Sequence, residues 1–489
     1  MPIESGFGHF TWLTALVISV CVVDAVAIAY DGSLMGSLNV MPAYSGYFHL
    51  TTTTKSLNTA ITFVGAIPVA LCAGPLINWR GRKFGIYLSA IIQIVGAVLQ
   101  GSSQHIAMFI VGRFFIGAGS GVAQVAASTY VAETVPSRIR SFALGLYFTC
   151  WAVGSLLAAG TAQMVDSTWS WRIPSLLQAA PSVAAIVVLI FLPESPRWLV
   201  YQDRNDEAIK IIARLHGTDS SDSVVQVQHR EIIDTLQFEK DDGRSVSYPE
   251  LFKTASNRKR LILALSVPLL AMLTGSNIIT FYFGTMLEQA GIDDSNTQLQ
   301  INVILSAWQL IVAFCGSLSA EKIGRKTLCL VSLGSATVFL YMVGGLTATF
   351  GEGTNRSGVY GTVASIFLFL GAYSFGITPL TVMYGPEVLS YSIRAGGMSL
   401  STALSKSCGL LVTFAFPYGF AAIGWKMYMI NASFNVLLWS FVLCYWVETK
   451  GRTLEEIDEV FDGMKHSDVP DLDLVARGKA DVLVEERQV

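Results

Sequence analysis

Twelve apolar runs dominate the sequence, and each is long enough to cross a lipid bilayer, which takes roughly 20 helical residues. Hydrophobic residues make up 52% of the 489-residue chain and charged residues 14%, a balance too apolar for a soluble protein. The sequence therefore predicts an all-α membrane protein with twelve transmembrane helices. The runs lie near residues 11–30, 57–77, 84–102, 107–127, 142–162, 173–192, 261–286, 301–320, 328–349, 359–380, 397–420 and 426–447.

A polar segment divides these runs into two sets of six. In residues 194–260, 23 of 67 residues are Asp, Glu, Lys or Arg. Within this segment, residues 205–217 place apolar side chains at helical spacing, which predicts a short amphipathic helix that clamps the bundle or binds a partner. We expect four parts: a first six-helix half (1–193), a linker (194–260), a second six-helix half (261–447) and a tail (448–489).

Lys and Arg are concentrated in the linker and in the loops that follow even-numbered runs. Because loops rich in Lys and Arg stay in the cytoplasm, we expect the linker and both termini on the cytoplasmic side of a multi-pass protein of the plasma membrane. Asn355 begins an Asn-Arg-Ser sequon in a loop predicted to be external. It is a candidate glycosylation site if the chain passes through a eukaryotic secretory route.

One motif occurs at matching places in the two halves. Gly81-Arg82-Lys83 follows the second run and Gly324-Arg325-Lys326 follows the eighth. Basic loop residues are expected from topology alone, but a paired motif indicates two equivalent halves around a midplane site. Because guanidinium groups form forked pairs with carboxylates, we predict a cytoplasmic gate. Its candidate residues are Arg82, Glu133, Arg140, Glu321, Arg325, Glu387 and Arg394.

Three further motifs resemble the signatures of a known family. They are Phe115-Ile-Gly117-Ala-Gly119-Ser-Gly121, Pro193-Glu-Ser-Pro-Arg197 and Val447-Glu-Thr-Lys-Gly451-Arg. Together they resemble the sugar porter family of the major facilitator superfamily, and the resemblance extends to about residue 460. YDGSLMGSLNVMP is similar to the fungal branch that includes lactose and cellodextrin permeases. The resemblance implies the major facilitator fold, short linker helices and secondary active transport of a sugar or sugar-like solute.

Asp31 is a carboxylate at the end of the first apolar run. A charge at mid-membrane costs several kcal/mol unless it faces a cavity or a partner, so Asp31 is a candidate functional residue. In proton-coupled relatives an Asp at this position works with an Arg at the position of Arg113, so the resemblance implies proton symport. The alternative is a static ion pair. We interpret Asp24, two helical turns earlier, as a residue that snorkels toward the cytoplasm, with a second titrating group as the alternative.

The resemblance also indicates where the solute should bind. Relatives supply Gln or Asn from helices 5, 7 and 10, and this chain has apolar or small residues at several of those places. Asn277 could bind the solute or could instead form a hydrogen bond between helices. The candidate pocket residues are Phe148, Met272, Asn277, Tyr282, Asn302, Gln309, Thr381 and Tyr384.

Lys406 is a cation within the eleventh apolar run. Since exposure to lipid would be costly, we expect it to face the central cavity, paired with a carboxylate such as Asp24 or contacting an anionic solute. A structural pair or a snorkelling lysine is the alternative. Lys406 raises a second hypothesis for the solute: a sugar acid, another small organic acid or a secondary metabolite.

Other classes of function have less support in the sequence. No nucleophile and base, metal-ligand set or nucleotide-binding loop is apparent, so we expect neither an enzyme nor a cofactor. A nutrient receptor that has kept the fold but lost transport is a third hypothesis. The expected partners are a small solute, a proton and the lipid bilayer, and no nucleic acid.

Overall fold

The fold is described from a computed structural model of the chain. The structure describes residues 11–50, 52–135, 150–158, 160–161, 169–241, 248–277, 279, 286–287, 295–350, 356–450, 452 and 454–462. In these ranges all regular structure is helical, and nine segments are long and apolar enough to cross a membrane. The predicted class, an all-α membrane protein, is confirmed.

The first half contains long helices that coincide with the predicted runs. A short helix, α2, follows α1, and α7 and α8 together cover the sixth run. The fifth run, 142–162, lies largely outside the described residues. The helices are α1 (Trp12–Val40), α2 (Pro42–Tyr47), α3 (Thr52–Arg80), α4 (Arg82–Gly101), α5 (Ile106–Thr134), α7 (Trp169–Leu177) and α8 (Ala179–Ile190).

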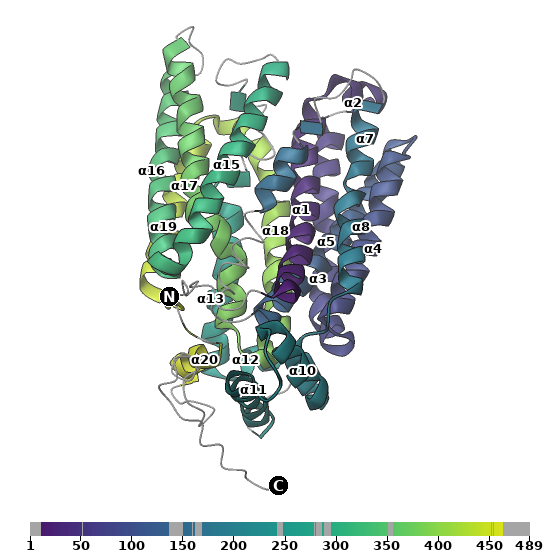
Figure 1. The fold of residues 1–489 in the computed structure, drawn as a ribbon. Helices are drawn as coiled ribbons and strands as arrows, with labels where there is room; N and C mark the ends of the chain where they lie inside the picture. The colour runs from purple at the N-terminus through teal and green to yellow at the C-terminus, as the bar shows by residue number, and fades with distance from the viewer. Residues whose placement is uncertain are drawn as a thin grey trace, which may run out of the picture.

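The second half repeats this arrangement. In Figure 1 its helices, teal to yellow-green, stand beside the purple and blue helices of the first half. They are α13 (Ala255–Leu273), α15 (Ser295–Ile323), α16 (Arg325–Phe350), α17 (Arg356–Val388), α18 (Tyr391–Ile423) and α19 (Lys426–Tyr445).

Several helices extend beyond the apolar runs that predicted them. The clearest is α1, which continues ten residues past the predicted end at residue 30. The polar residues that ended the run have partners inside the bundle: Asp31 pairs with Arg113, and the Ser33 hydroxyl donates to the Ser155 hydroxyl over 2.6 Å. Because these groups are satisfied, the helix can continue without an unpaired polar side chain facing lipid.

Five short helices gather at one end of the bundle, which we call the linker face (Figure 1). The helix predicted for 205–217 is present as α10, with Gly217 in the left-handed conformation at its end (φ 69°). The hydroxyls of Thr11, the N-cap of α1, and of Thr14 within α1 donate to the Leu215 carbonyl over 3.1 and 3.3 Å, so α10 is joined to the first half. The five are α9 (Pro196–Tyr201), α10 (Asn205–His216), α11 (Ser223–Asp241), α12 (Glu250–Lys253) and α20 (Leu454–Asp462).

The two halves are in contact at the linker face. There α18 packs against α3 so closely that a Cβ atom on Gly74 would lie 2.8 Å from the Ala395 carbonyl oxygen. One hydrophobic core at this face includes Val125 of α5 and Leu263 of α13, one from each half. Elsewhere each half has a core of its own, around Trp171 in the first and around Phe369 in the second. The described conformation is therefore closed at the linker face.

Candidate functional site

A buried ion pair connects α4 and α5 at the linker face. Arg82 donates from Nε and Nη2 to the two carboxylate oxygens of Glu133, over 2.9 and 3.1 Å. The Ser195 hydroxyl donates to the same carboxylate over 2.6 Å. A forked, charge-assisted pair of this kind is strong and geometrically specific. The pairing of Arg82 with Glu133 is the contact that the gate prediction requires.

Glu194 completes this network from the segment after α8. Its carboxylate accepts from the backbone N–H groups of Arg82 (2.9 Å) and Lys83. Burial raises the pKa of Glu194, while these N–H groups and the Arg82 guanidinium oppose that shift. Gly81 has a φ of 98°, and a Cβ atom there would lie 2.3 Å from the Glu194 carboxylate. Only glycine fits this turn.

The second half reproduces the same network. Arg325 donates to Glu387 over 3.3 and 3.1 Å, and the Thr449 hydroxyl donates to Glu387 over 2.6 Å. Glu448 accepts from the backbone N–H of Arg325 over 2.7 Å, as Glu194 does from Arg82. Gly324, with a φ of 97°, lies against Glu448 as Gly81 lies against Glu194.

Our sequence reasoning missed Glu194 with Ser195 and Glu448 with Thr449 as members of the gate network. The signal was present, because a Glu-Ser or Glu-Thr pair follows the last helix of each half, in Pro193-Glu-Ser and Val447-Glu-Thr. Aligning the two motifs with each other would have paired these residues.

Gate residues also make contacts between the halves. Arg394 of α18 lies with Nη1 3.6 Å from a carboxylate oxygen of Glu133, and its Nε donates to the carbonyls of Pro386 and Leu389. The Arg82 guanidinium also lies over the ring of Tyr391, 5.5 Å from its centre. Glu133 therefore faces arginines from both halves. Arg140 and the side chain of Glu321 lie outside the described residues.

A second buried ion pair lies deeper in the first half. Arg113 of α5 donates from Nη1 to Asp31 of α1, and its Nε donates to the Asn58 carbonyl over 3.3 Å. The exposed fractions of Asp31 and Arg113 are 5% and 2%. The two residues are therefore paired as expected.

Lys406 of α18 lies within electrostatic range of Asp31. It is 8% exposed, so it is not a snorkelling side chain at the lipid surface. The charge of Lys406 acts on the Asp31 carboxylate of α1. Two cations and one carboxylate meet here, one of the cations coming from the opposite half.

Our interpretation of Asp24 as a snorkelling residue is wrong. It lies twelve residues from the start of α1, about 18 Å along the helix axis. It is 3% exposed and acts electrostatically on the buried Cys21. A short carboxylate side chain at this depth cannot reach the aqueous surface.

The helix is interrupted after α13 at Thr274 and Gly275, and helical structure resumes at residues 276–277. Gly275 has a φ of 104°, and the Asn277 amide donates to the Met272 carbonyl over 3.0 Å. Two amide side chains of α19 donate to carbonyls freed by the end of the helix: Asn431 to Leu273 over 2.8 Å and Asn435 to Thr274 over 3.0 Å. Asn277 thus donates to one of the backbone carbonyls near the interruption. Our sequence reasoning missed Asn431 and Asn435, which donate to two others.

Tyr384 does not lie in a pocket, which corrects our expectation. Its hydroxyl donates to the Val447 carbonyl over 3.1 Å and accepts from the Val447 N–H over 3.0 Å. The ring is fully buried and stacks on Trp446 with 3.9 Å between ring centres. In the first half the Tyr130 hydroxyl likewise donates to the Pro193 carbonyl, over 2.7 Å. Tyr384 therefore belongs to the linker-face network.

The other pocket candidates are not gathered into one site by the described contacts. Asn302 and Gln309 are half-buried on α15, and the half-buried Thr381 donates to its own helix at the Thr378 carbonyl over 2.6 Å. In the described part of the chain, no hydrogen bond joins Asn302, Gln309 or Thr381 to one another or to Asp31. Phe148, Tyr282 and Asn355 lie outside the described residues.

Comparisons with known proteins agree with this architecture. Residues 16–461 match the family described as "Sugar (and other) transporter". The MFS-type transporter criB of Aspergillus cristatus is 29% identical over 454 residues, covering 92% of this chain and 94% of that protein. The MFS glucose transporter mfs1 of Aspergillus flavus is 29% identical, covering 88% of this chain and 87% of that protein.

A solved structure has the same fold. It is the MFS proton:xylose symporter XylE bound to 6-bromo-6-deoxy-D-glucose, with a TM-score of 0.79, 18% identity and coverage of 92% of this chain and 100% of that chain. Two repeated helical halves with ionisable residues between them are the architecture of a secondary transporter in the membrane. With the match over residues 16–461, the chain belongs to the sugar transporter family of the major facilitator superfamily.

Proposed function

We propose that this protein moves a sugar or sugar-like solute across the membrane by alternating access, with a proton as the coupled ion. The observation behind this proposal is the Asp31–Arg113 pair, buried between α1 and α5 and acted on by Lys406 from the other half. The relative mfs1 is named a glucose transporter, and the XylE structure is that of a proton:xylose symporter. We further propose that the linker face is cytoplasmic and that the membrane is the plasma membrane.

Alternation requires the linker face to open while each half stays intact. The contacts within each half are short forked pairs, Arg82 with Glu133 and Arg325 with Glu387. The ion pair between the halves, Arg394 with Glu133, is longer at 3.6 Å. Rocking therefore breaks the weaker contact and keeps the stronger ones, since Coulomb energy falls with distance.

Protonation of Asp31 changes the attraction between the two halves at the centre of the molecule. An ionised Asp31 attracts Arg113 from its own half and Lys406 from the opposite half. When the carboxyl is neutral both attractions are lost, and the two halves are freer to separate around the solute site. Proton binding would thus change the relative free energies of the two access states, which is what coupling requires.

The test is solute-driven proton entry into liposomes that contain the full chain and a trapped pH dye. Neutral sugars should acidify the interior, and Asp31→Asn should abolish that signal while solute exchange at equal concentrations continues. Sugar exchange without acidification in the unmodified chain would refute proton coupling. The same liposomes with Gly345→Ala, where the added methyl group would meet nothing within 4 Å, should keep the coupling.

An anionic solute is the second candidate, and Lys406 is the observation that favours it. With Asp31 ionised, the cluster of Asp31, Arg113 and Lys406 has one excess positive charge in a buried setting. A carboxylate on the solute would neutralise it. Lys406→Met should then reduce uptake of sugar acids far more than uptake of neutral sugars. If uptake of every solute is unchanged by this substitution, the anion hypothesis is excluded.

A further inference from the structure

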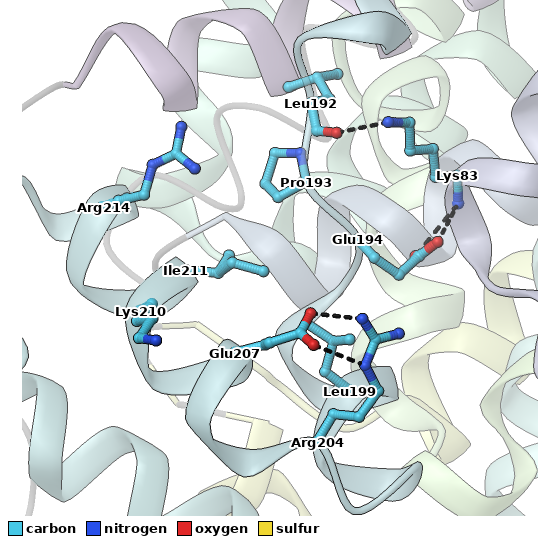
Figure 2. Close-up of a pocket in the computed structure, with 10 residues that line it drawn as sticks. All are labelled: Lys83, Leu192, Pro193, Glu194, Leu199, Arg204, Glu207, Lys210, Ile211 and Arg214. Atoms are coloured by element: carbon cyan, nitrogen blue, oxygen red, sulfur yellow. Dashed lines mark hydrogen bonds and ion pairs between the residues drawn. The ribbon is translucent and has the colours of Figure 1, made fainter.

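A cavity of about 410 Å³ lies at the linker face, between the start of α4, the segment after α8 and α10 (Figure 2). It is separate from the buried Asp31 cluster, although Glu194 of the gate network forms part of its lining. Cavities of roughly 300–1,000 Å³ bind small ligands in proteins. Six charged side chains contribute to its lining: Lys83, Glu194, Arg204, Glu207, Lys210 and Arg214.

The two acidic side chains in this lining are already compensated. Glu207 accepts from Arg204 over 3.1 and 2.5 Å, which neutralises that pair. Glu194 accepts from backbone N–H groups, including that of Lys83. With four cations and two acids, the lining of the cavity has a net positive charge.

Three cations remain available to a ligand. Lys83 donates once, to the Leu192 carbonyl over 2.8 Å, and an ammonium group has three donors. Lys210 and Arg214 are exposed, and no hydrogen bond or ion pair joins their side chains to another residue in the described part of the chain. In Figure 2, Arg214 and Lys83 lie on opposite sides of the cavity, with Ile211 pointing into the space between them.

The cavity also lies at the edge of a lipid-facing surface. Ile190 and Phe191 at the end of α8 are 68% and 65% exposed, and Leu192 of the cavity lining follows them directly. Apolar side chains this exposed at the end of a membrane-spanning helix contact acyl chains in a bilayer. A ligand with its anionic part among the cations would thus have its apolar part beside Phe191.

We propose that this cavity binds the phosphate-bearing headgroup of an anionic membrane lipid through Lys83, Lys210 and Arg214. Basic pockets at the cytoplasmic ends of membrane helices suit such headgroups. The bound phosphate would join α4 of the first half to α10 of the linker, and α10 is itself joined to the start of α1 through Leu215. The lipid would therefore stabilise the linker helices on the closed linker face.

The test measures binding by the full chain, in mild detergent, of a short-chain phosphatidylinositol 4-phosphate. Lys210→Gln with Arg214→Gln should weaken binding about 25-fold, since each cation near an anionic surface contributes roughly fivefold. The matched control, Arg258→Gln with Lys322→Gln, removes two exposed cations from the same face outside the cavity and should leave affinity unchanged.

Three results would overturn the proposal. Equal loss of affinity in the control variant would mean diffuse attraction to a basic face. Equal binding of short-chain phosphatidylcholine, which has no net charge, would mean that the anionic headgroup is not recognised. If the soluble inositol phosphate headgroup binds as tightly as the lipid, the ligand is a phosphorylated solute and not a lipid. Binding is measured without transport, so failure here leaves the proposed transport function untouched.

Discussion

Replacing Gly74 by Ala should open the linker face. The new Cβ atom would lie 2.6 Å from the Ser399 hydroxyl and 2.8 Å from the Ala395 carbonyl oxygen. The serine can rotate away, but the carbonyl belongs to the backbone of α18, so α3 and α18 must separate. Overpacking of this kind costs about 1–3 kcal/mol, and the cost falls only on the closed conformation. The ratio of open to closed molecules should rise roughly 5- to 150-fold.

Gly345→Ala is the matched control. Gly345 lies within α16, and a Cβ atom there would meet nothing within 4 Å. Alanine favours a helix over glycine by about 1 kcal/mol at either position, and this gain is the same in both conformations. The control should therefore raise thermal stability without moving the gate.

Pulsed electron paramagnetic resonance can measure the opening. Spin labels would replace Arg80 and Lys322, which are exposed at the linker ends of α3 and α15, in a chain whose exposed cysteines have been changed to serine. Gly74→Ala should lengthen the distance between the labels. If the distances match those of Gly345→Ala in a chain that melts normally, the contact at Gly74 does not keep the face closed.

Three further predictions concern the linker-face networks. Ser195→Ala should cost about 1.5–3 kcal/mol, because a hydrogen bond to the buried Glu133 carboxylate is lost; thermal melts should show the drop, and Thr449→Val should match it in the second half. Tyr384→Phe should lower stability by about 1–3 kcal/mol, because the backbone groups of Val447 lose their hydrogen-bond partner. It should leave the solute KM unchanged, and a raised KM would mean that Tyr384 contacts the solute. Because burial raises the pKa of Glu194, the folded chain holds the carboxyl proton to higher pH than the unfolded chain does. The stability of the fold should therefore fall as pH rises through this pKa. Thermal melts at several pH values should show that decline, and Glu194→Gln should flatten it.

The helices could be predicted because their lipid-facing sides require long apolar runs. Their ends could not, since polar residues inside the bundle interrupt the run without ending the helix. Asp31 is the clearest case: it closed the predicted run, yet α1 continues to Val40 because Arg113 satisfies the carboxylate. Hydropathy measures the free-energy cost of placing a residue in lipid. A polar partner inside the bundle lowers that cost.

Site residues were predictable where a repeat supplied a second copy. The Gly-Arg-Lys motif led to Arg82 and Arg325, and each is paired with a glutamate in the structure. Tyr384 was misplaced because it was chosen as a polar residue on a helix that supplies pocket residues in relatives, and this choice does not show the depth at which the side chain lies. Comparison with Tyr130, which makes the equivalent bond in the first half, would have placed it at the linker face.

Two carboxylates of the first half share one arrangement at two depths. At the linker face, Glu133 is bonded directly to Arg82 of its own half and lies 3.6 Å from Arg394 of the other. Deeper in the bundle, Asp31 is bonded directly to Arg113 of its own half and interacts at longer range with Lys406 of the other. Both cross-half cations come from α18, so a single movement of that helix away from the first half would weaken both contacts while each carboxylate keeps its own arginine. In the proposed transport cycle, neutralising Asp31 removes one of the two attractions, so a proton bound at the centre would ease the opening of the linker face.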